Sequence, residues 1–463
     1  MVTTATDATA AIAVNRFGLG KRASEPLPAD PRHWLLDQIG RYEPRPATFA
    51  QLQTTPEIAT QYASDRQKLQ ALDGDEKIAL RKELNKAARL LYRGEIDARS
   101  RNALATPTPF LEALVHFWSN HFAVSADNPA MLSLAGAFER DAIRPHVTGR
   151  FTDLLFAAEQ HPAMLIYLDQ IRSAGPDSPL ATRAKRRNAD KLPGINENLA
   201  REIMELHTVG VGSGYTQKDV TEFALALTGW SAGRMGGKAD ASQAGVFQYR
   251  PGLHQPGKRL IRRRVYGATG EDQAGAVLKD LASDPATANH IATKLCRHFI
   301  ADTPPQDAVN RVSKAFLASG GDLPAAYKAL VEAPEAWAVP SAKIKTPWEW
   351  LVSAMRGLDY PDLGKANAAN LLNQLGQPVW LPRSPAGYDD IAASWLAPDA
   401  LVRRVEVSQR LAARADRLLK PEELANNLLG NALTDSTATQ INRAESVQTG
   451  IALLLVSPDF QRR

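Results

Sequence analysis

The stretch GINENLAREIMELHTVGVGSGYTQKDVTEFALALTGW, residues 194–230, predicts two helices joined by a glycine-rich turn. Apolar residues recur every three to four positions on either side of the turn, as on the core face of a helix. Gly210 falls where a left-handed residue commonly ends a helix. Thr216, followed three residues later by Asp219, predicts a capping box that starts the second helix. The chain is therefore organised around a helical pair.

The first helix of this pair carries more polar residues than packing requires. Asn198, Glu202 and Glu205 share one face, and Glu197, Arg201 and Glu205 follow one another at intervals of four. Two carboxylates three residues apart can share a metal ion or a proton. They form a solvated or ion-paired face more often, and the spacing alone leaves both interpretations open.

Length and composition indicate an ordinary globular protein. The 463 residues could form about three average domains, or one large helical domain with lobes. A hydrophobic fraction of 44% is enough for a substantial core, and the net charge of +5 is small. Basic residues gather at 183–191 and 258–264 without interleaved aromatic residues, so we do not expect nucleic-acid binding. No apolar stretch approaches the roughly 18 residues of a membrane span.

Cysteine content and the N-terminal sequence bear on location. The single cysteine, Cys296, cannot form an internal disulfide, and we expect it to be a buried thiol. The first 20 residues have no basic segment and only a short apolar run, so we expect no signal peptide. The sequence as written therefore favours a cytoplasmic location.

Residues 56–100 alternate in charge and predict a mostly exposed helical hairpin bent near Asp73 and Gly74. An arm that docks a partner is the functional alternative. The pattern fits both.

Residues 107–129 predict a helix with an apolar stripe and three polar residues of interest. His116 and Asn120 share a face, whereas His121 points about 140° away from His116, so the two histidines cannot easily bind one metal. A lone helical histidine among aromatic residues is most often a satisfied core residue. We expect His116 and Asn120 to matter if their face meets the carboxylate helix.

Two further histidine patterns follow. The runs VFQYR and RLIRRRVYG predict a small β-hairpin near 246–267 that carries His254 at its tip, and loops often carry function. His290, Lys294 and His298 are spaced by four on one predicted helix. The lysine between the two histidines disfavours a metal site by repulsion.

These patterns predict a mainly α fold, a large multi-helical domain with a small β-hairpin insertion. We divide the chain into an N-terminal helical lobe, residues 1–172, a central region, residues 173–270, and a C-terminal helical lobe, residues 271–463. The three regions are expected to form one compact domain.

Common catalytic signatures are missing from the sequence. Ser213 has Val211 and Tyr215 at the positions where a nucleophile elbow needs glycine. Glycines 210–214 follow a helix instead of preceding one, which is the wrong order for a phosphate cradle. The reaction class therefore stays open.

The sequence resembles the bacterial family catalogued as domain of unknown function 1800 from about residue 9 to the C-terminus. The resemblance lies in the central stretch and in HFWSNHFAVS (116–125), HPAMLIYLD (161–169), HIATKLCRHFIAD (290–302) and SPDFQRR (457–463). It implies no established activity. Relatives are often encoded beside proteins of domain of unknown function 1501, which implies a partner or a shared pathway, and many relatives are exported.

The resemblance also implies a set of recurring polar positions. They fall here on His116, Asn120, His121, Asp169, Asn196, Glu197, Asn198, Arg201, Glu202, Glu205, Asp219 and His254. Relatives commonly have an acidic residue after the loop histidine, where this chain has Gln255. A role for an acid at that point is therefore in doubt.

The first functional hypothesis is an enzyme, in one version dependent on a divalent metal ion. Its catalytic candidates are Glu202, Glu205, His116, His254 and Arg201, with Glu202, Glu205 and His116 as the metal ligands. Its orienting or substrate-binding candidates are Asn120, Asn198, Glu197, His121 and Asp169. Arg201 is assigned to an anionic group of the substrate.

The alternative is a non-catalytic scaffold or accessory protein that acts with a partner such as a domain of unknown function 1501 protein. In that case the same side chains form a structural network, with Arg201 paired to Glu197 or Glu205. Breaking one partner of a buried network costs roughly 3–5 kcal/mol. Replacing both Glu202 and Glu205 by Gln separates the hypotheses through metal content and melting temperature.

Overall fold

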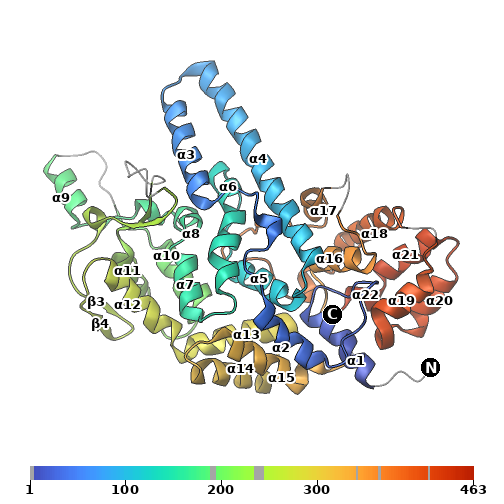
Figure 1. Ribbon diagram of the computed structural model, residues 1–463. Coiled ribbons are helices and arrows are strands. Elements are labelled where there is room, and N and C mark those ends of the chain that lie inside the picture. The colour runs from blue at the N-terminus through green and yellow to red at the C-terminus, as the bar shows by residue number, and fades with distance from the viewer. Residues whose placement is uncertain (1–4, 188–193, 234–243, 340–342, 363–366, 416–417) are drawn as a thin grey trace.

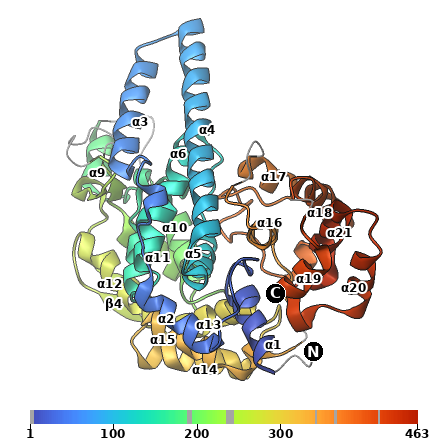
Figure 2. The ribbon, with the colours of Figure 1, turned by 45° about the vertical axis from the view of Figure 1, so that its right-hand side comes forward.

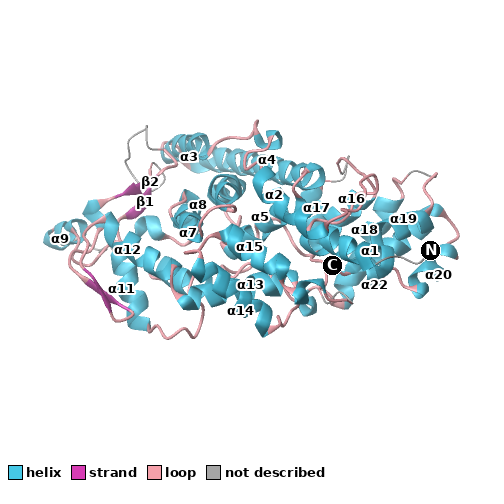
Figure 3. Cartoon of the chain, turned by 60° about the horizontal axis from the view of Figure 1, so that its bottom comes forward, coloured by secondary structure: helices cyan, strands magenta, loops and turns pink. Residues whose placement is uncertain are grey.

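The computed structural model describes residues 5–187, 194–233, 244–339, 343–362, 367–415 and 418–463. Within them the chain forms 22 α-helices and four short strands, so the predicted mainly α fold is confirmed (Figure 1). The strands lie together at one end of the molecule, and helices make up the rest (Figure 3).

Nine helices form the first part of the chain. They are α1 (Ala5–Ile12), α2 (Pro31–Arg41), α3 (Thr55–Gln70), α4 (Gly74–Ala105), α5 (Pro109–His121), α6 (Pro129–Phe138), α7 (Phe151–Glu159), α8 (Pro162–Tyr167) and α9 (Pro179–Arg186). Five of them begin with proline at the first position, where a missing N–H leaves no hydrogen bond unmade.

Thirteen helices follow. They are α10 (Asn198–Glu202), α11 (Gln217–Leu227), α12 (Glu271–Ala282), α13 (Pro285–Phe299), α14 (Gln306–Ala318), α15 (Leu323–Glu332), α16 (Pro347–Gly357), α17 (Ala368–Gln374), α18 (Pro398–Ala412), α19 (Pro421–Leu429), α20 (Asp435–Asn442), α21 (Val447–Val456) and α22 (Pro458–Gln461). Helices α18 to α22 gather beside the body of the molecule (Figure 2).

Helices α3 and α4 form an arm that projects from the body (Figures 1 and 2). Thr54 and Glu57 make a reciprocal capping box at the start of α3, and Gly74 begins α4 with a positive φ of 55°. The outer part of α4 is exposed, whereas its last third is largely buried. The predicted helical hairpin is confirmed.

Helix α5 lies at the centre of the core. Its apolar stripe is fully buried, and the indole N–H of Trp118 donates to the Tyr327 hydroxyl at 2.7 Å. One continuous cluster of buried apolar side chains runs from Ile12 to Phe460. The division into three regions remains a prediction. Cys296 is a buried free thiol on α13, as expected.

The central helical pair forms as predicted. Helix α10 continues as a π-helical turn (Ile203–His207), and Gly210 has φ of 81° while its N–H donates to the carbonyl of Met204. Thr216 and Asp219 cap α11 reciprocally. The glycine and capping-box signals in the sequence were therefore sufficient to predict this helical pair.

The prediction of one β-hairpin near 246–267 was wrong in its pairing. Strand β2 (Phe247–Tyr249) pairs with β1 (Trp230–Ala232), and β3 (Arg259–Ile261) pairs with β4 (Arg264–Tyr266). Two residues with positive φ, Arg262 and Arg263, turn β3 directly into β4, so the second run folds on itself. His254 consequently does not sit at a hairpin tip.

No helix among the described residues is both long enough and apolar enough to cross a membrane.

Candidate functional site

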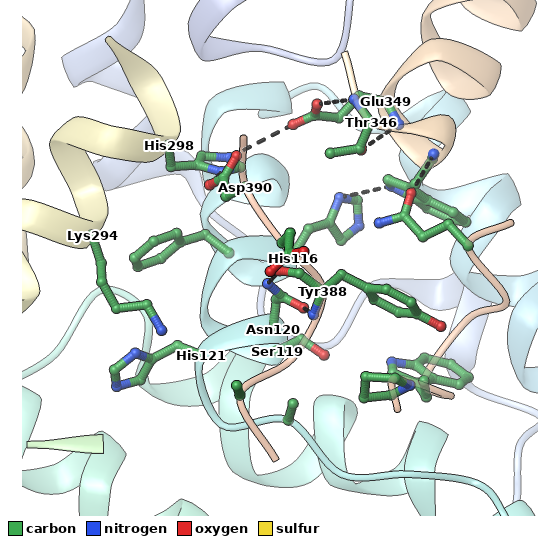
Figure 4. Close-up of a pocket in the computed structure, with 18 of the residues that line it drawn as sticks. His116, Ser119, Asn120, His121, Lys294, His298, Thr346, Glu349, Tyr388 and Asp390 are labelled. Atoms are coloured by element: carbon green, nitrogen blue, oxygen red, sulfur yellow. Dashed lines mark hydrogen bonds and ion pairs between the residues drawn. The ribbon is translucent and has the colours of Figure 1, made fainter. Parts of the chain in front are cut away.

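A cavity of about 400 Å³ opens between α5, α13, the start of α16 and the loop of residues 377–391 (Figure 4). This volume lies within the range of small-molecule sites. Its labelled wall residues come from four segments that are far apart in the sequence. A second, more open groove lies around His254 in the described part of the chain.

His116 lies in the cavity wall with both ring nitrogens engaged. The indole N–H of Trp348 donates to Nδ1 at 3.1 Å, so the ring proton is on Nε2, which donates to Glu112 at 3.1 Å. Burial lowers the pKa of His116, and the nearby charge of Arg99 adds to this effect. The ring is a neutral structural link, and it meets α16 instead of the carboxylate helix.

Asn120 clamps the loop that closes the cavity. Its Nδ2 donates to the carbonyl of Tyr388 at 2.9 Å, and its Oδ1 accepts the N–H of Tyr388 at 2.7 Å. Gly387 next to it has φ of 80°, and a β-carbon there would lie 2.4 Å from the Asn120 carbonyl oxygen. Asn120 therefore positions residues 377–391.

His121 and His290 present two neutral imidazole rings 6.3 Å apart. The Nε2 of each ring lies about 3 Å from a carbonyl, that of His207 at 3.1 Å and that of Leu206 at 3.0 Å. Because a carbonyl only accepts, Nε2 carries the proton and Nδ1 keeps its lone pair. Burial, reinforced by Lys294, lowers the pKa of His290 to about 4 and that of His121 well below its usual value.

Lys294 extends along the cavity wall towards His121 (Figure 4). Its amine forms no hydrogen bond or ion pair with any described residue. Burial lowers the pKa of Lys294 to about 8, against the opposing charge of Asp390. An amine that is partly unprotonated near neutral pH can act as a base or a nucleophile.

His298 lies between two carboxylates. Its Nδ1 is 2.5 Å from Asp390 Oδ2, and its Nε2 is 3.7 Å from Glu349 Oε1. The other oxygen of Glu349 accepts the N–H of Thr346 in the capping box of α16. The orientation of the His298 ring is therefore fixed from both sides.

The side chains of Arg463 and Lys343 supply positive charge beside these carboxylates. Arg463 is 3.0 Å from Glu349, and its N–H donates to the carbonyl of Lys343. The amine of Lys343 is 3.3 Å from Asp390. Burial alone would raise the pKa of Asp390, but His298 and Lys343 outweigh it and hold the pKa far below its usual range.

A buried ion-pair network lies behind the wall formed by His116. Arg99 binds Glu139 with its Nε 2.9 Å from the carboxylate, and Arg144 donates to Glu112 at 2.8 Å. Burial opposes ionisation of Glu112, but Arg144 outweighs it and holds the pKa of Glu112 far below its usual range. The network is internally neutralised and anchors α4 and α5 to the helical turns of residues 139–146 that follow α6.

The charged face of the central helix is an ion-paired surface. Arg201 lies 3.3 Å from both Glu197 and Glu205, and Glu197 also accepts from Gln217 and Thr221. The hydrogen bond from Thr221 is the main cause of the lowered pKa of Glu197. Arg201 is thus paired with both predicted partners.

Glu202 is half-buried beside this face, and no described residue forms an ion pair with it. Burial raises the pKa of Glu202, partly offset by His207. Glu205 adds its negative charge in the same direction as burial. The two glutamates interact electrostatically, as their spacing predicted.

The remaining predicted residues lie elsewhere. His254 donates from Nδ1 to the carbonyl of Thr228 at 2.9 Å and lines a second, open groove with Arg183. Asp169 is exposed in a left-handed turn with φ of 56°, and Asn198 is exposed at the start of α10. The predicted residues are therefore distributed among four places: the cavity, the charged face of the central helix, the second groove and the turn at Asp169.

The metal-ligand prediction fails on geometry. In the described ranges no three His, Cys, Asp or Glu side chains gather as ligands for a metal ion. Glu202, Glu205 and His116 are all described, and both nitrogens of His116 are already bonded. These three residues do not assemble as one donor set.

Several cavity residues were not among the predicted site residues. Lys294 and His298 were noted for their spacing with His290, but the lysine was taken only as an argument against metal. Asp390 and Tyr388 lie on a proline-rich loop whose partners depend on tertiary packing. The spacing of His290, Lys294 and His298 by four on α13 was the sequence signal that could have identified these residues.

The fold and site define a large helical protein with an enclosed, lysine-containing cavity between its helices. The family model described as "Protein of unknown function (DUF1800)" matches residues 12–462. The chain belongs to this family, as the resemblance predicted. No curated protein and no solved structure matches the chain.

Proposed function

We propose that the chain is an enzyme that binds a small anionic molecule in this cavity, with Lys294 as the catalytic amine. The observation that supports this most is the Lys294 amine, which lines the cavity without a carboxylate partner among the described residues. Lys294 is partly buried, and removing an amine from water without such a partner costs free energy. Groups with strongly shifted pKa values in a cavity are concentrated at functional sites.

The charge of the cavity favours an anionic ligand. Asp390 lies within ion-pair distance of Lys343, Glu349 lies within ion-pair distance of Arg463, and His298 contacts both carboxylates. Lys294 and Arg297 lie three residues apart on α13 and both line the cavity. Apart from its Nε–H, which donates to the carbonyl of Asp302, the guanidinium of Arg297 forms no hydrogen bond or ion pair with described residues. Lys294 and Arg297 therefore line the cavity without an ion pair to a described residue, and Asp390 is the carboxylate whose charge acts on Lys294.

A thermal-shift screen of small carboxylates and phosphates tests this proposal. We expect at least one class to raise the melting temperature of the wild type, with the effect lost in Lys294→Met and reduced in Arg297→Gln. Lys279→Met is the matched control, because Lys279 is exposed on α12 away from the cavity. Equal stabilisation of wild type and Lys294→Met by every ligand that binds would contradict the proposal.

The projecting arm supports the accessory-protein alternative. Lys82, Lys86, Arg89 and Arg93 are spaced four, three and four residues apart and share one exposed face of α4. None of the four is ion-paired with a described residue. Such a stripe suits an acidic protein surface, and the resemblance suggests a domain of unknown function 1501 protein as the partner.

Charge reversal tests this second function. A variant with Lys82, Lys86, Arg89 and Arg93 changed to Glu is expected to lose binding to a purified domain of unknown function 1501 protein in sedimentation experiments. Reversal of Arg66 and Lys68 on α3, which are equally exposed, is the control and is expected to retain it. Binding that survives the α4 reversal, or that does not weaken with salt, would contradict this alternative.

A further inference from the structure

We propose that the cavity takes a small 2-oxo acid, whose carboxylate binds Arg297 and whose carbonyl carbon forms an imine with the Lys294 amine. This inference rests on the proposed function and names its substrate class and reaction intermediate. It is carried by an amine, a cation and a buried proton acceptor that meet at one cavity.

The amine has the reactivity that the step needs. With a pKa of about 8, about one Lys294 in ten is unprotonated at pH 7, compared with fewer than about one in a thousand for an ordinary lysine. The neighbouring rings of His121 and His290 are neutral and do not compete for a carboxylate. Desolvated lysines of this kind are the usual source of imines in proteins.

Arg297 gives the preference for a 2-oxo acid over a simple aldehyde. Side chains three residues apart on a helix have β-carbons about 5–6 Å apart. A 2-oxo acid carries its carboxylate on the carbon next to the carbonyl, which suits two neighbouring groups of this kind. The guanidinium binds a carboxylate through parallel hydrogen bonds and orients the carbonyl towards the amine.

His121 provides the proton acceptor. Its Nδ1 is buried and has no hydrogen-bond partner among the described residues, and the His121 residue belongs to the cavity wall. As the amine nitrogen attacks, a C–N bond forms and the carbonyl π pair moves to oxygen. The proton leaves the nitrogen for His121 Nδ1 and returns to the oxygen. That oxygen then leaves as water with a second proton from the nitrogen, and the C=N bond forms without any oxidant or reductant.

Lys345, which is buried, shows why the cavity matters. Burial lowers the pKa of Lys345 to about 7, but its amine donates to Ser353 at 2.9 Å and lies 4.1 Å from the centre of the Phe460 ring. Lys345 is not part of the cavity wall. Lys345 is therefore an internal control: its pKa is lowered, but its amine does not line the cavity.

The test is reductive trapping of the full-length protein with pyruvate and sodium cyanoborohydride, followed by peptide mapping. We expect a carboxyethyl group on Lys294 at substoichiometric pyruvate, with at least tenfold less on Lys345 or on exposed Lys279. Lys294→Met is expected to abolish this label, and Arg297→Gln to slow it about tenfold. The wild-type map needs no variant, so a poorly folding variant does not affect the result.

A second readout separates this inference from the proposed function. Lactate, which has the same carboxylate but no carbonyl, is expected to protect Lys294 from trapping. Stabilisation of the protein by pyruvate and lactate without any label on Lys294 would overturn the imine and leave the anion site intact. Uniform labelling of surface lysines, with no stabilisation by any anion, would overturn both.

Discussion

At the scale of single residues, the surroundings of Lys294 decide its chemistry more than burial does. Lys294 and Lys345 both have lowered pKa values, yet only Lys294 faces a cavity. The amine of Lys345 is held by Ser353 and by the ring of Phe460. A shifted pKa therefore identifies a site only together with access and free hydrogen-bonding capacity.

Gly210 connects the central turn to the cavity. It has φ of 81°, and a β-carbon there would lie 2.8 Å from Nδ1 of His290. Gly210→Ala is expected to lower the free energy of unfolding by about 2–4 kcal/mol, because backbone strain and a clash add. Gly212→Ala, with φ of 78° and open space around it, is expected to cost only about 1 kcal/mol. Denaturant unfolding of the two variants measures both losses of stability. Equal losses would contradict the close approach of Gly210 to the His290 ring.

The two central glutamates are expected to respond differently to neutralisation. Burial raises the pKa of Glu202, so the folded state holds its proton more tightly than the unfolded state does. Ionised Glu202 therefore destabilises the fold at neutral pH, and Glu202→Gln is expected to raise the melting temperature at pH 7.

Glu205→Gln removes one half-exposed ion pair with Arg201 and is expected to cost less than about 1 kcal/mol. Melting curves at pH 7 and pH 3.5 test both variants, because the gain from Glu202→Gln is expected to vanish at the lower pH. A sharp loss of stability for Glu202→Gln at pH 7 would support a buried structural network instead.

At the scale of elements, the sequence predicted what is encoded locally. The capping box at Thr216 and the arm of α3 and α4 depend on residues within a few positions of one another. Strand β1 was not predicted, because its three residues pair with β2, which follows many positions later in the chain. Short strands of this kind carry too few residues for a periodic signal.

The clamp between α5 and the cavity loop gives a prediction at the same scale. Asn120→Ala removes two hydrogen bonds to Tyr388 and is expected to cost about 1–3 kcal/mol. Amide hydrogen exchange is expected to increase within residues 377–391. Asn128→Ala, which removes the N-cap of α6, is expected to lower stability without this local change. Unchanged exchange in the loop of Asn120→Ala would show that the clamp does not hold it.

At the scale of the whole molecule, the cavity is a product of long-range packing. Its walls come from α5, α13, α16 and residues 377–391, and the side chain of Arg463 lies 3.0 Å from Glu349 and 3.8 Å from Asp390. The sequence identified polar residues on α5 but could not show which segment they face. His116 was expected to meet the carboxylate helix and instead meets Trp348.

The same packing predicts loss of stability in acid. The folded-state pKa values of His121 and His290 are lowered, so the unfolded chain binds protons first and stability falls as pH drops below about 6.5. Asp390 and Glu112 also have lowered pKa values, and their contribution is lost below about pH 4.

Denaturant unfolding from pH 8 to pH 3.5 measures this dependence. We expect His290→Gln to flatten the part between pH 7 and pH 5, removing a dependence on the order of 2 kcal/mol. A wild-type stability that is constant down to pH 5 would contradict neutral burial of these rings.

The central claim is that the cavity holds a partly unprotonated amine. It is tested most directly by competitive acetylation of the protein across pH 6–11, with each lysine followed by peptide mapping. The structure predicts half-maximal reactivity of Lys294 near pH 8, while exposed Lys279 titrates near 10.4. A midpoint for Lys294 at or above 10 would mean that its amine is an ordinary solvated ammonium and would contradict the account.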